Sequence, residues 1–245
     1  IHPLSKYFKT YHFLVRDVET ETIVSRATIT TYPNEAEVAY FGFFESEDIQ
    51  DAVKCLFDGL SGWAAEHAYK RLVGPVNASF WLGYRLKTDH FDTPYAGEPY
   101  NKPYYQRLLE YVGFGITDEY QSNRFGRIGS GFSNQKFAAR LEQKLGEGYR
   151  IVSPVKEEFD QALRDIYRLL SRLYQDFPVF HHIKEEDFVS VYSYLKAVID
   201  YRMVKLAYAE GDMVGFFISV PNYKNDAAGK MNVGKFLHFL KTRVR

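Results

Sequence analysis

Polar and apolar residues alternate along the first part of the chain. The alternation has a period of two over residues 11–18, 22–32 and 37–44, and short polar turns separate these segments. Because successive side chains of a strand point to opposite faces of a sheet, this period predicts half-buried β-strands. Short turns between strands favour antiparallel pairing. The pattern therefore predicts an antiparallel meander, with Gly42 as a candidate bulge.

The period then changes to that of a helix. Apolar side chains recur at helical spacing over residues 47–69, and Ser46 is the expected N-cap. A short strand is predicted over 71–76, and a loop over 77–101, whose length is typical of loops that carry function or cover a site. A further helix is predicted over 103–113, because Pro103 suits its first turn and Gly113 its C-terminal end.

A glycine-rich segment divides the chain. Residues 116–125 have the composition of a strand, and they precede a cluster of glycines at 126–131. An amphipathic helix is predicted next, over 134–145. We therefore predict a first domain over residues 1–130 and a linker helix within 131–148.

The remaining residues, 149–245, are predicted to begin a second domain. A strand, two helices and a hairpin are expected in this order, over 149–152, 156–176, 186–199, 203–209 and 213–220. The hairpin resembles the first one in pattern, which supports two related units.

The composition is that of a folded protein, with 46% hydrophobic and 17% aromatic residues. The 31 basic and 31 acidic residues cancel, so no basic surface is expected for nucleic acid or for an anionic membrane. No apolar run reaches the length of a transmembrane helix. The single cysteine, Cys55, cannot form a disulfide within the chain, which fits a reducing compartment. We therefore expect a cytoplasmic protein that binds neither nucleic acid nor membranes.

Several short sequences resemble those of a known family. They are Tyr40-Phe-Gly-Phe-Phe-Glu-Ser46, Gly74-Pro-Val-Asn77, Phe91-Asp-Thr-Pro94 and Tyr104–Phe114. With the order of the predicted elements, they resemble bacterial proteins that carry two N-acetyltransferase (GNAT) domains in tandem. The resemblance implies an α/β (α+β) fold, with two GNAT-like mixed sheets flanked by helices. It also implies acyl transfer from an acyl-CoA to an amine.

Compared with that family, both predicted domains are incomplete. The first opens at a hairpin and lacks the strand and helices that precede it in the family. Residues 235–245 would lead into the fourth strand of the second domain. Either the natural protein extends beyond Arg245 or the two halves complement one another, and we expect the first.

In the family, a glycine-containing loop at the N-terminus of the long helix holds the pyrophosphate of the cofactor. The matching segment here, Phe44–Asp51, has no glycine and carries Glu45, Glu47, Asp48 and Asp51. Carboxylates at this end stabilise a helix, and they would repel a phosphate. We expect a capped helix in a non-catalytic first domain. Acetyl-CoA or another acyl-CoA is then expected in the second domain, although no phosphate-loop motif in this chain supports it.

The family often uses a tyrosine on the last helix as a general acid, four residues before the glycine of a Gly-Phe pair. Leu109 occupies that position here. Tyr105 lies one turn earlier and shares its helix face, so it is a weak candidate for the acid. A buried or cleft-lining aromatic is the favoured interpretation of Tyr105.

The loop between residues 77 and 105 is rich in aromatic side chains mixed with a few polar ones. This composition suits a pocket for a small amine or a peptide-like ligand. An aromatic cluster that fastens a long loop is the favoured interpretation. Asn77 is the best polar candidate, either as a bridge between diverging strands or as a ligand contact. The candidate substrate-binding residues are Asn77, Tyr84, Asp92, Tyr95, Tyr104 and Tyr105.

Other groups of reactive side chains give weaker signals. His181 and His182, followed by Glu185 and Glu186, have metal-ligand chemistry, but their spacing matches no metal site. We expect a polar turn there and predict no metal.

The resulting prediction is an N-acyltransferase-like protein that acts on an unknown amine. The first alternative is a non-catalytic protein on the same fold that binds a small molecule or a peptide. The second is a relative of the tandem-GNAT aminoacyl transferases, which need no CoA.

Overall fold

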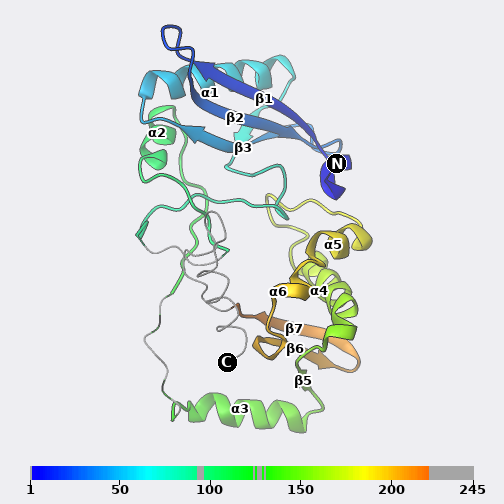
Figure 1. Ribbon diagram of the computed structural model, residues 1–245. Coiled ribbons are helices and arrows are strands. Elements are labelled where there is room, and N and C mark those ends of the chain that lie inside the picture. The colour runs from blue at the N-terminus through cyan, green and yellow to red at the C-terminus, as the bar shows by residue number, and fades with distance from the viewer. Residues whose placement is uncertain (1, 93–96, 124, 126–128, 130, 221–245) are drawn as a thin grey trace. The chain divides into compact units, whose positions relative to one another are not determined.

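The computed structural model describes residues 2–92, 97–123, 125, 129 and 131–220. These residues form two compact units (Figure 1). Unit 1 contains the chain up to Gly115 together with Leu173–Val191, and unit 2 contains Ile116–Arg172 and Tyr192–Val220. Each unit has one sheet with helices, which confirms the α/β class with two sheets. The domain limits 1–130, 131–148 and 149–245 stay a prediction.

The sheet of unit 1 has the order β1-β2-β3-β4. Its strands are β1 (Lys9–Arg16), β2 (Ile23–Thr31), β3 (Val38–Ser46) and β4 (Arg71–Val73). The first three pair antiparallel, as the alternating pattern predicts, and β4 joins β3 in parallel. The sheet is therefore mixed, with an antiparallel meander at one side.

Helix α1 (Gln50–Glu66) lies across one face of this sheet (Figure 1). It begins later than the pattern predicts, because β3 continues through Ser46. The prediction of Ser46 as the N-cap was therefore wrong. The Ser46 hydroxyl instead donates to the carbonyl oxygens of Val24 and Glu47. Ile49 is at the N-cap position and makes no side-chain cap.

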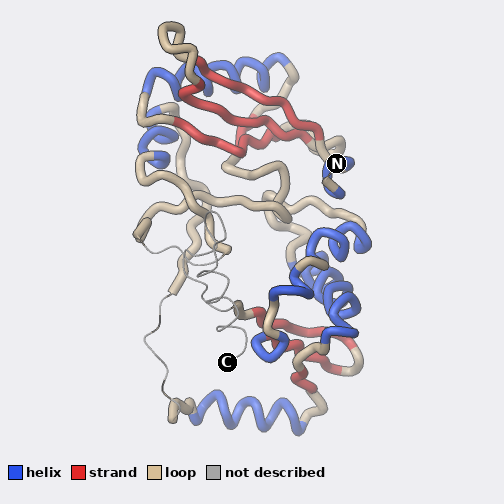
Figure 2. Tube along the Cα trace, viewed as in Figure 1, coloured by secondary structure: helices blue, strands red, loops and turns tan. Residues whose placement is uncertain are grey.

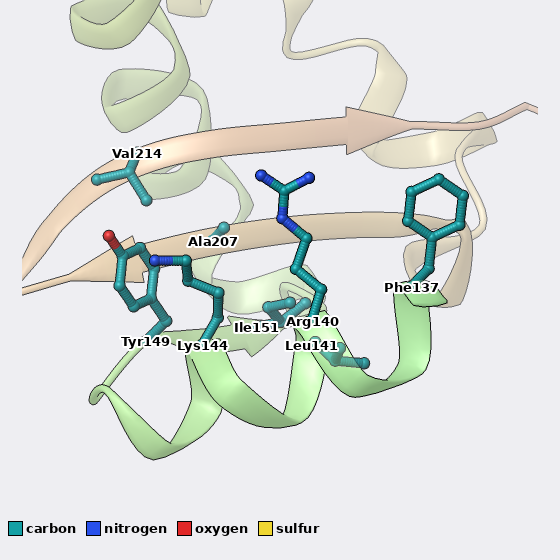
Figure 3. A pocket seen from close by; sticks show the side chains of 8 residues that line it. All are labelled: Phe137, Arg140, Leu141, Lys144, Tyr149, Ile151, Ala207 and Val214. Carbon is teal, nitrogen blue, oxygen red and sulfur yellow. The ribbon is translucent and has the colours of Figure 1, made fainter. Parts of the chain in front are cut away.

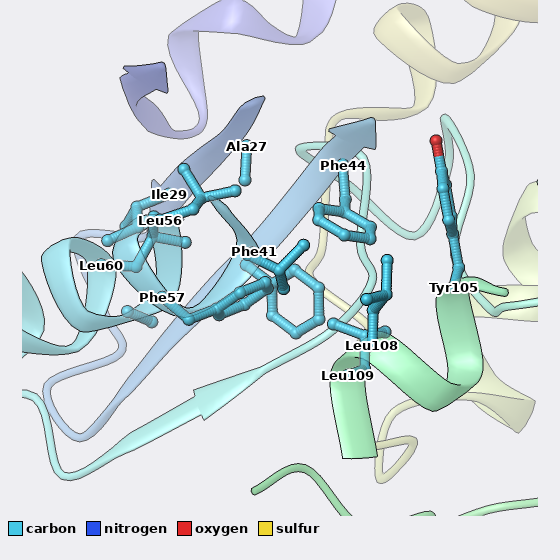
Figure 4. Close-up of a cluster of buried hydrophobic side chains, with 12 residues drawn as sticks. Ala27, Ile29, Phe41, Phe44, Leu56, Phe57, Leu60, Tyr105, Leu108 and Leu109 are labelled. Carbon is cyan, nitrogen blue, oxygen red and sulfur yellow. The ribbon is translucent and has the colours of Figure 1, made fainter. Parts of the chain in front are cut away.

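Helix α2 (Tyr105–Tyr111) completes the cover of this face. It is shorter than predicted, and Gly113 follows it with φ +93°, the left-handed conformation expected of a terminating glycine. Together α1, α2 and the inner sheet face enclose the main hydrophobic core (Figure 4). The buried members are Ala27, Ile29, Ala39, Phe41, Phe44, Val53, Leu56, Phe57, Leu60, Tyr105, Leu108 and Leu109.

Two glycines allow β3 and the chain after β4 to approach closely. A Cβ on Gly42 would lie 1.9 Å from the carbonyl oxygen of Val76, and one on Gly74 would lie 2.3 Å from that of Phe41. Both obstacles are backbone atoms, which cannot move aside as a flexible side chain can. The backbone amide of Val76 donates to the carbonyl oxygen of Phe41 at 2.7 Å. Gly42 is thus needed for close approach beside the bulge of β3.

The chain after Val76 is irregular as far as α2 (Figure 2). An isolated bridge between Val76 and Tyr84 folds its first part back on itself. The side chain of Asn101 binds the backbone of Lys87, earlier in the same irregular segment. Its side-chain oxygen accepts from the amide of Lys87 at 2.7 Å, and its side-chain nitrogen donates to the Lys87 carbonyl at 3.0 Å.

Unit 2 contains a three-stranded antiparallel sheet of order β5-β6-β7. The predicted hairpin is confirmed, and its turn residues Glu210 and Gly211 have φ +53° and +94°. Helix α4 is amphipathic and buries one face in unit 2; Tyr208 of β6 donates to its Asp165 at 3.0 Å. The elements of unit 2 are α3 (Gln135–Gly146), β5 (Arg150–Val152), η2 (Lys156–Glu158), α4 (Phe159–Leu173), α6 (Leu195–Val198), η3 (Tyr201–Met203), β6 (Val204–Ala209) and β7 (Asp212–Ile218).

The predicted helix over 134–145 is confirmed as α3, and its role as a linker stays a prediction. Asn134 is its N-cap, and the Asn134 side chain accepts from the amide of Phe137. The predicted strand over 116–125 was wrong, because none of its described residues pairs with a strand. Ile116 and Phe125 are 56% and 79% exposed, so their side chains are not packed against a sheet. Strand-forming residues form a strand only where they can pack and pair in this way.

The predicted helix over 186–199 is divided into α5 (Glu185–Tyr192) and α6. Residues 173–191, which include most of α5, pack within unit 1. Tyr7, which follows the N-terminal turn η1 (Pro3–Lys6), hydrogen-bonds to Asp187, and its hydroxyl accepts from the amide of Lys184 at 2.7 Å. The expectation for residues 235–245 lies outside the described residues.

Candidate functional site

A pocket of about 440 Å³ lies where β3 and the chain after β4 diverge, within unit 1. Its volume falls in the range of sites for small organic ligands. It is bordered by the end of β3, the irregular chain after β4 and the start of α2. The lining residues are Arg26, Phe43, Phe44, Glu45, Pro75, Asn77, Phe80, Trp81, Leu82, Gly83, Tyr84, Arg85, Leu86, Gly97, Glu98, Pro99, Tyr100, Asn101 and Tyr105.

Asn77 connects the two diverging strands at the edge of the pocket. Its side-chain oxygen accepts a hydrogen bond from the backbone amide of Phe43 at 2.7 Å. Phe43 is at the bulge of β3 and has φ +48°, a left-handed conformation that few non-glycine residues adopt. The bond therefore satisfies an amide that the bulge leaves unpaired in the sheet. Asn77 thus has the bridging role, one of the two alternatives predicted for it.

Tyr105 and Glu45 form a hydrogen-bonded pair beside Asn77. The Tyr105 hydroxyl donates to Oε2 of Glu45 at 2.5 Å and accepts from the backbone amide of Ser46 at 3.1 Å. The Tyr105 ring is 2% exposed, and its hydroxyl points away from the core cluster (Figure 4). Burial and the bond to Glu45 raise the pKa of the Tyr105 phenol well above its usual range. Tyr105 is thus a phenol that stays protonated and holds a carboxylate in place.

The pocket contains charges of both signs. Arg26 and Glu45 are directly opposite each other in the register of β2 and β3, so they share one face of the sheet. The carboxylate of Glu98 pairs with the Lys87 ammonium at 3.5 Å, and the Arg85 guanidinium lies 5.0 Å from the centre of the Tyr84 ring. The Arg26 guanidinium has no ion-pair or hydrogen-bond partner among the described residues.

Aromatic side chains form one wall of the pocket. Phe80 stacks on Tyr84 with ring centroids 5.0 Å apart, and Trp81 packs edge-to-face on Phe80 at 5.1 Å. Behind this wall lies the segment 173–191 of unit 1: Phe180 packs against both Phe80 and Trp81, and the Trp81 indole donates to the His181 carbonyl at 3.0 Å. The loop is therefore fastened by an aromatic cluster, which was the second interpretation of its composition.

The structure brings together three of the candidate substrate-binding residues. Asn77, Tyr84 and Tyr105 line the pocket. Tyr104 does not; its hydroxyl donates to the Ser46 carbonyl at 2.9 Å. Asp92 is exposed and does not line the pocket. Tyr95 lies outside the described residues.

Sequence reasoning missed Glu45, Arg26 and Phe80 as site residues. Glu45 was assigned to the start of a helix, whereas it lies on β3. The signal was available in the period of two, because Phe44 is buried and a strand that continues past it places Glu45 on the other face. Arg26 could be found only from its register with Glu45, which the sequence does not specify.

The N-terminus of α1 does not have the features of a phosphate site. Asp51 is in its first turn, and the nearby Asp48 pairs with Arg107 at 2.5 Å. Negative charge at this end already satisfies the helix dipole. These residues therefore do not fit the pyrophosphate of a CoA.

A second hollow, of about 330 Å³, lies in unit 2 between α3 and the sheet (Figure 3). Its lining includes Phe137 and Leu141 of α3 and Ala207 and Val214 of the sheet, and Arg140 and Lys144 are its charged members. The walls are mostly apolar. Among the described lining residues there is no carboxylate, and the only hydroxyl is the phenol of Tyr149.

No helix of the described residues is both long and apolar enough to cross a bilayer.

Comparisons with known proteins give distant matches. No protein-family model matches the chain. A bacterial ceramide synthase from Caulobacter vibrioides is 24% identical over 216 residues, which cover 86% of this chain and 54% of that protein. Protein YghO of Escherichia coli K12 is 20% identical over 201 residues, which cover 82% of this chain and 51% of that protein. The chain thus spans about half the length of the curated relatives it matches.

Among solved structures, the crystal structure of FemX aligns with 84% of this chain and 50% of its own, at 11% identity and a TM-score of 0.34. A TM-score this low does not establish a common fold. The fold and the pocket described above therefore rest on the structure of this chain itself.

Proposed function

We propose that this chain belongs to an N-acyltransferase, which joins an acyl group to the nitrogen of an amine. The observation that carries the proposal is the match to a bacterial ceramide synthase along 86% of the chain. A ceramide is the amide of a fatty acid and a long-chain amino alcohol, so its synthesis is an N-acylation. At 24% identity the proposal concerns the class of reaction and leaves the particular amine open.

The pocket at the end of β3 supports an amine as the acyl acceptor. It combines aromatic walls with an anionic side chain, Glu45, and a side-chain amide, Asn77. Aromatic rings and a carboxylate are the groups that bind organic cations. We therefore place the acceptor amine in this pocket.

The acyl donor is proposed to be a thioester such as an acyl-CoA. In the transfer, the ammonium first loses one proton to solvent. The neutral amine nitrogen then forms a bond to the acyl carbon, the carbon–sulfur bond breaks, and the thiol leaves with the second proton that the nitrogen gives up. Because Asp48 and Asp51 occupy the α1 N-terminus, we place the phosphate groups of the donor elsewhere, in the predicted second domain.

A non-catalytic binding protein is the second candidate function. The carboxylates at the start of α1 favour it, because unit 1 would then use the same pocket for binding alone. This alternative predicts saturable binding of an amine with no amide product.

Mass spectrometry of a reaction mixture tests the proposal. The natural protein is incubated with palmitoyl-CoA and a long-chain amino alcohol, and both the amide and the released CoA are measured. We expect the two products in equal amounts. The matched control is the N,N-dimethyl form of the same acceptor, which cannot form a neutral amide. Failure to form an amide with long- or short-chain acyl-CoA, under conditions where the amine binds, would favour the binding protein.

A further inference from the structure

From the side chains around Glu45, we infer that this pocket recognises a primary amine that carries a hydroxyl or another oxygen group on the neighbouring carbon. The ammonium group binds Glu45, the oxygen group binds Arg26, and Tyr105 is the positioning residue for Glu45. This inference rests on the proposed function only in naming the bound amine as the acyl acceptor. The binding itself does not depend on acyl transfer.

Glu45 has one oxygen occupied and one available. Its Oε2 accepts from Tyr105 at 2.5 Å, while its Oε1 has no hydrogen-bond partner among the described residues. Tyr105 is itself fixed, because its ring is buried in the core and its hydroxyl also accepts from the Ser46 amide. The carboxylate is therefore held at the pocket without an ion pair. An ammonium group at Oε1 would supply the missing positive partner.

Arg26 gives the pocket a second polar group, next to the Glu45 carboxylate. It is the register partner of Glu45, and Cα atoms of such pairs lie about 5 Å apart. The two side chains line the same pocket, yet no ion pair joins them in the structure. A ligand with a donor and an acceptor on adjacent carbons can satisfy both at once. A simple amine satisfies Glu45 alone.

The other charges of the pocket are already engaged. Glu98 is paired with Lys87, and Arg85 lies against the Tyr84 ring. Of the charged residues that line the pocket, Glu45 and Arg26 are thus the two that can bind a ligand. The aromatic wall of Phe80 and Tyr84 provides the apolar surface for the hydrocarbon part.

Calorimetry on the natural protein, with ligands that differ by one group, tests the inference. Leucinol has the amine and the hydroxyl, isopentylamine has only the amine, and isohexanol has only the hydroxyl. We expect leucinol to bind most tightly and isohexanol least. The Glu45→Gln variant should lose about 10- to 100-fold in leucinol affinity, the effect of removing a charged hydrogen-bond partner. Its affinity for isohexanol should not change.

Two further variants complete the design. Glu47→Gln makes the same chemical change two residues away, outside the pocket, and should bind leucinol like the unaltered protein. Arg26→Gln should bind leucinol and isopentylamine equally, because it removes the contact to the hydroxyl. Thermal unfolding of each variant checks that the fold is kept.

A double-mutant cycle tests the role of Tyr105. If Tyr105 acts through Glu45, Tyr105→Phe lowers leucinol affinity in the unaltered protein and has little further effect in Glu45→Gln. A purely structural role would give the same loss in both backgrounds.

The outcomes separate this inference from the proposed function. Absence of saturable leucinol binding, or equal binding by Glu45→Gln and the unaltered protein, overturns the inference even if amides are formed. Binding that depends on Glu45 without any amide product upholds the inference and contradicts the acyltransferase.

Discussion

The two sheets of this protein differ in how their apolar faces are covered. In unit 1, α1 and α2 cover the inner face, and Leu60 in the middle of α1 is fully buried. In unit 2, α4 buries one side of its amphipathic pattern, but α3 has no buried residue, and its Leu141 is 44% exposed. Helices α1 and α3 both have an apolar stripe at helical spacing. Such a stripe therefore predicts a helix but does not predict how deeply the helix is buried.

The pocket of unit 1 and the hollow of unit 2 also differ in how firmly their lining side chains are held. The pocket of unit 1 is bordered by fixed groups, including the Asn77 bridge and the Tyr105–Glu45 pair. The hollow of unit 2 lies between α3 and β-strands, where Ile151 and Val214 are each 45% exposed. A preorganised site needs side chains whose own positions are determined by packing and hydrogen bonds. Unit 1 has such a shell, and this is why the functional proposal is placed there.

The largest effect is expected from adding one methyl group at the closest backbone approach of unit 1. Gly42→Ala places a Cβ 1.9 Å from the Val76 carbonyl oxygen, so β3 and the neighbouring chain must separate. We expect a loss of about 3 kcal/mol or more in the free energy of unfolding, measured by urea denaturation.

Gly62→Ala is the matched control for this change. Gly62 lies on α1 with nothing within 4 Å of its added Cβ, so the same substitution should stabilise by about 0.5–1 kcal/mol. Equal effects of the two substitutions would contradict the close approach of β3 and the chain after β4.

A pair of leucine truncations tests the comparison of the two units directly. Leu60→Ala removes a fully buried side chain and should cost about 2–5 kcal/mol of unfolding free energy. Leu141→Ala removes a half-exposed one and should cost less than about 0.5 kcal/mol. Denaturant unfolding of both variants gives the two values. A large loss for Leu141→Ala would mean that α3 is covered.

A smaller effect is expected from His181, on the segment that packs behind the aromatic wall. Its ring stacks on Tyr32 at 3.5 Å and lies edge-on to Tyr40, and its Nε2 is buried without a partner among the described residues. Burial, with a smaller contribution from His182, lowers the pKa of His181 from 6.5 to about 4.

The sign of the pH dependence follows from this lowered pKa. Below pH 6.5 the unfolded chain takes up a proton that the folded protein does not bind, so stability falls as the pH drops from 6.5 towards 4. For this partly exposed ring we expect a loss of about 2 kcal/mol. His181→Phe keeps the stacking and should remove this part of the pH dependence. Identical stability–pH curves for the two proteins would show that His181 does not titrate in this way.

Much of unit 1 could be predicted from the sequence, because its elements find partners close by in the chain. The strand alternation, the glycine that ends α2 and the helical face of α1 are local signals, and the structure has all of them. The start of α1 was misplaced because Ser46 is a good N-cap by type, whereas β3 pairing carries the strand through that residue. Tertiary hydrogen bonding overrode a local preference there.

The candidate site was predictable only in part. Asn77, Tyr84 and Tyr105 could be selected as polar or aromatic residues of a long loop and the following helix. Glu45 and Arg26 could not, because their proximity depends on the register of β2 against β3. Residues 173–191 also could not be assigned to unit 1, since their contacts with it are between residues about 100 positions apart in the chain, as for Trp81 and His181.

Amide formation by the natural protein and by its Glu45→Gln variant would test the acceptor site at the end of β3. Mass spectrometry should detect the N-acyl product of a long-chain amino alcohol and an acyl-CoA with the unaltered protein. At acceptor concentrations well below saturation, the variant should form it at least about tenfold more slowly. No amide from the unaltered protein, or equal rates from the two proteins, would contradict an acceptor site at the end of β3.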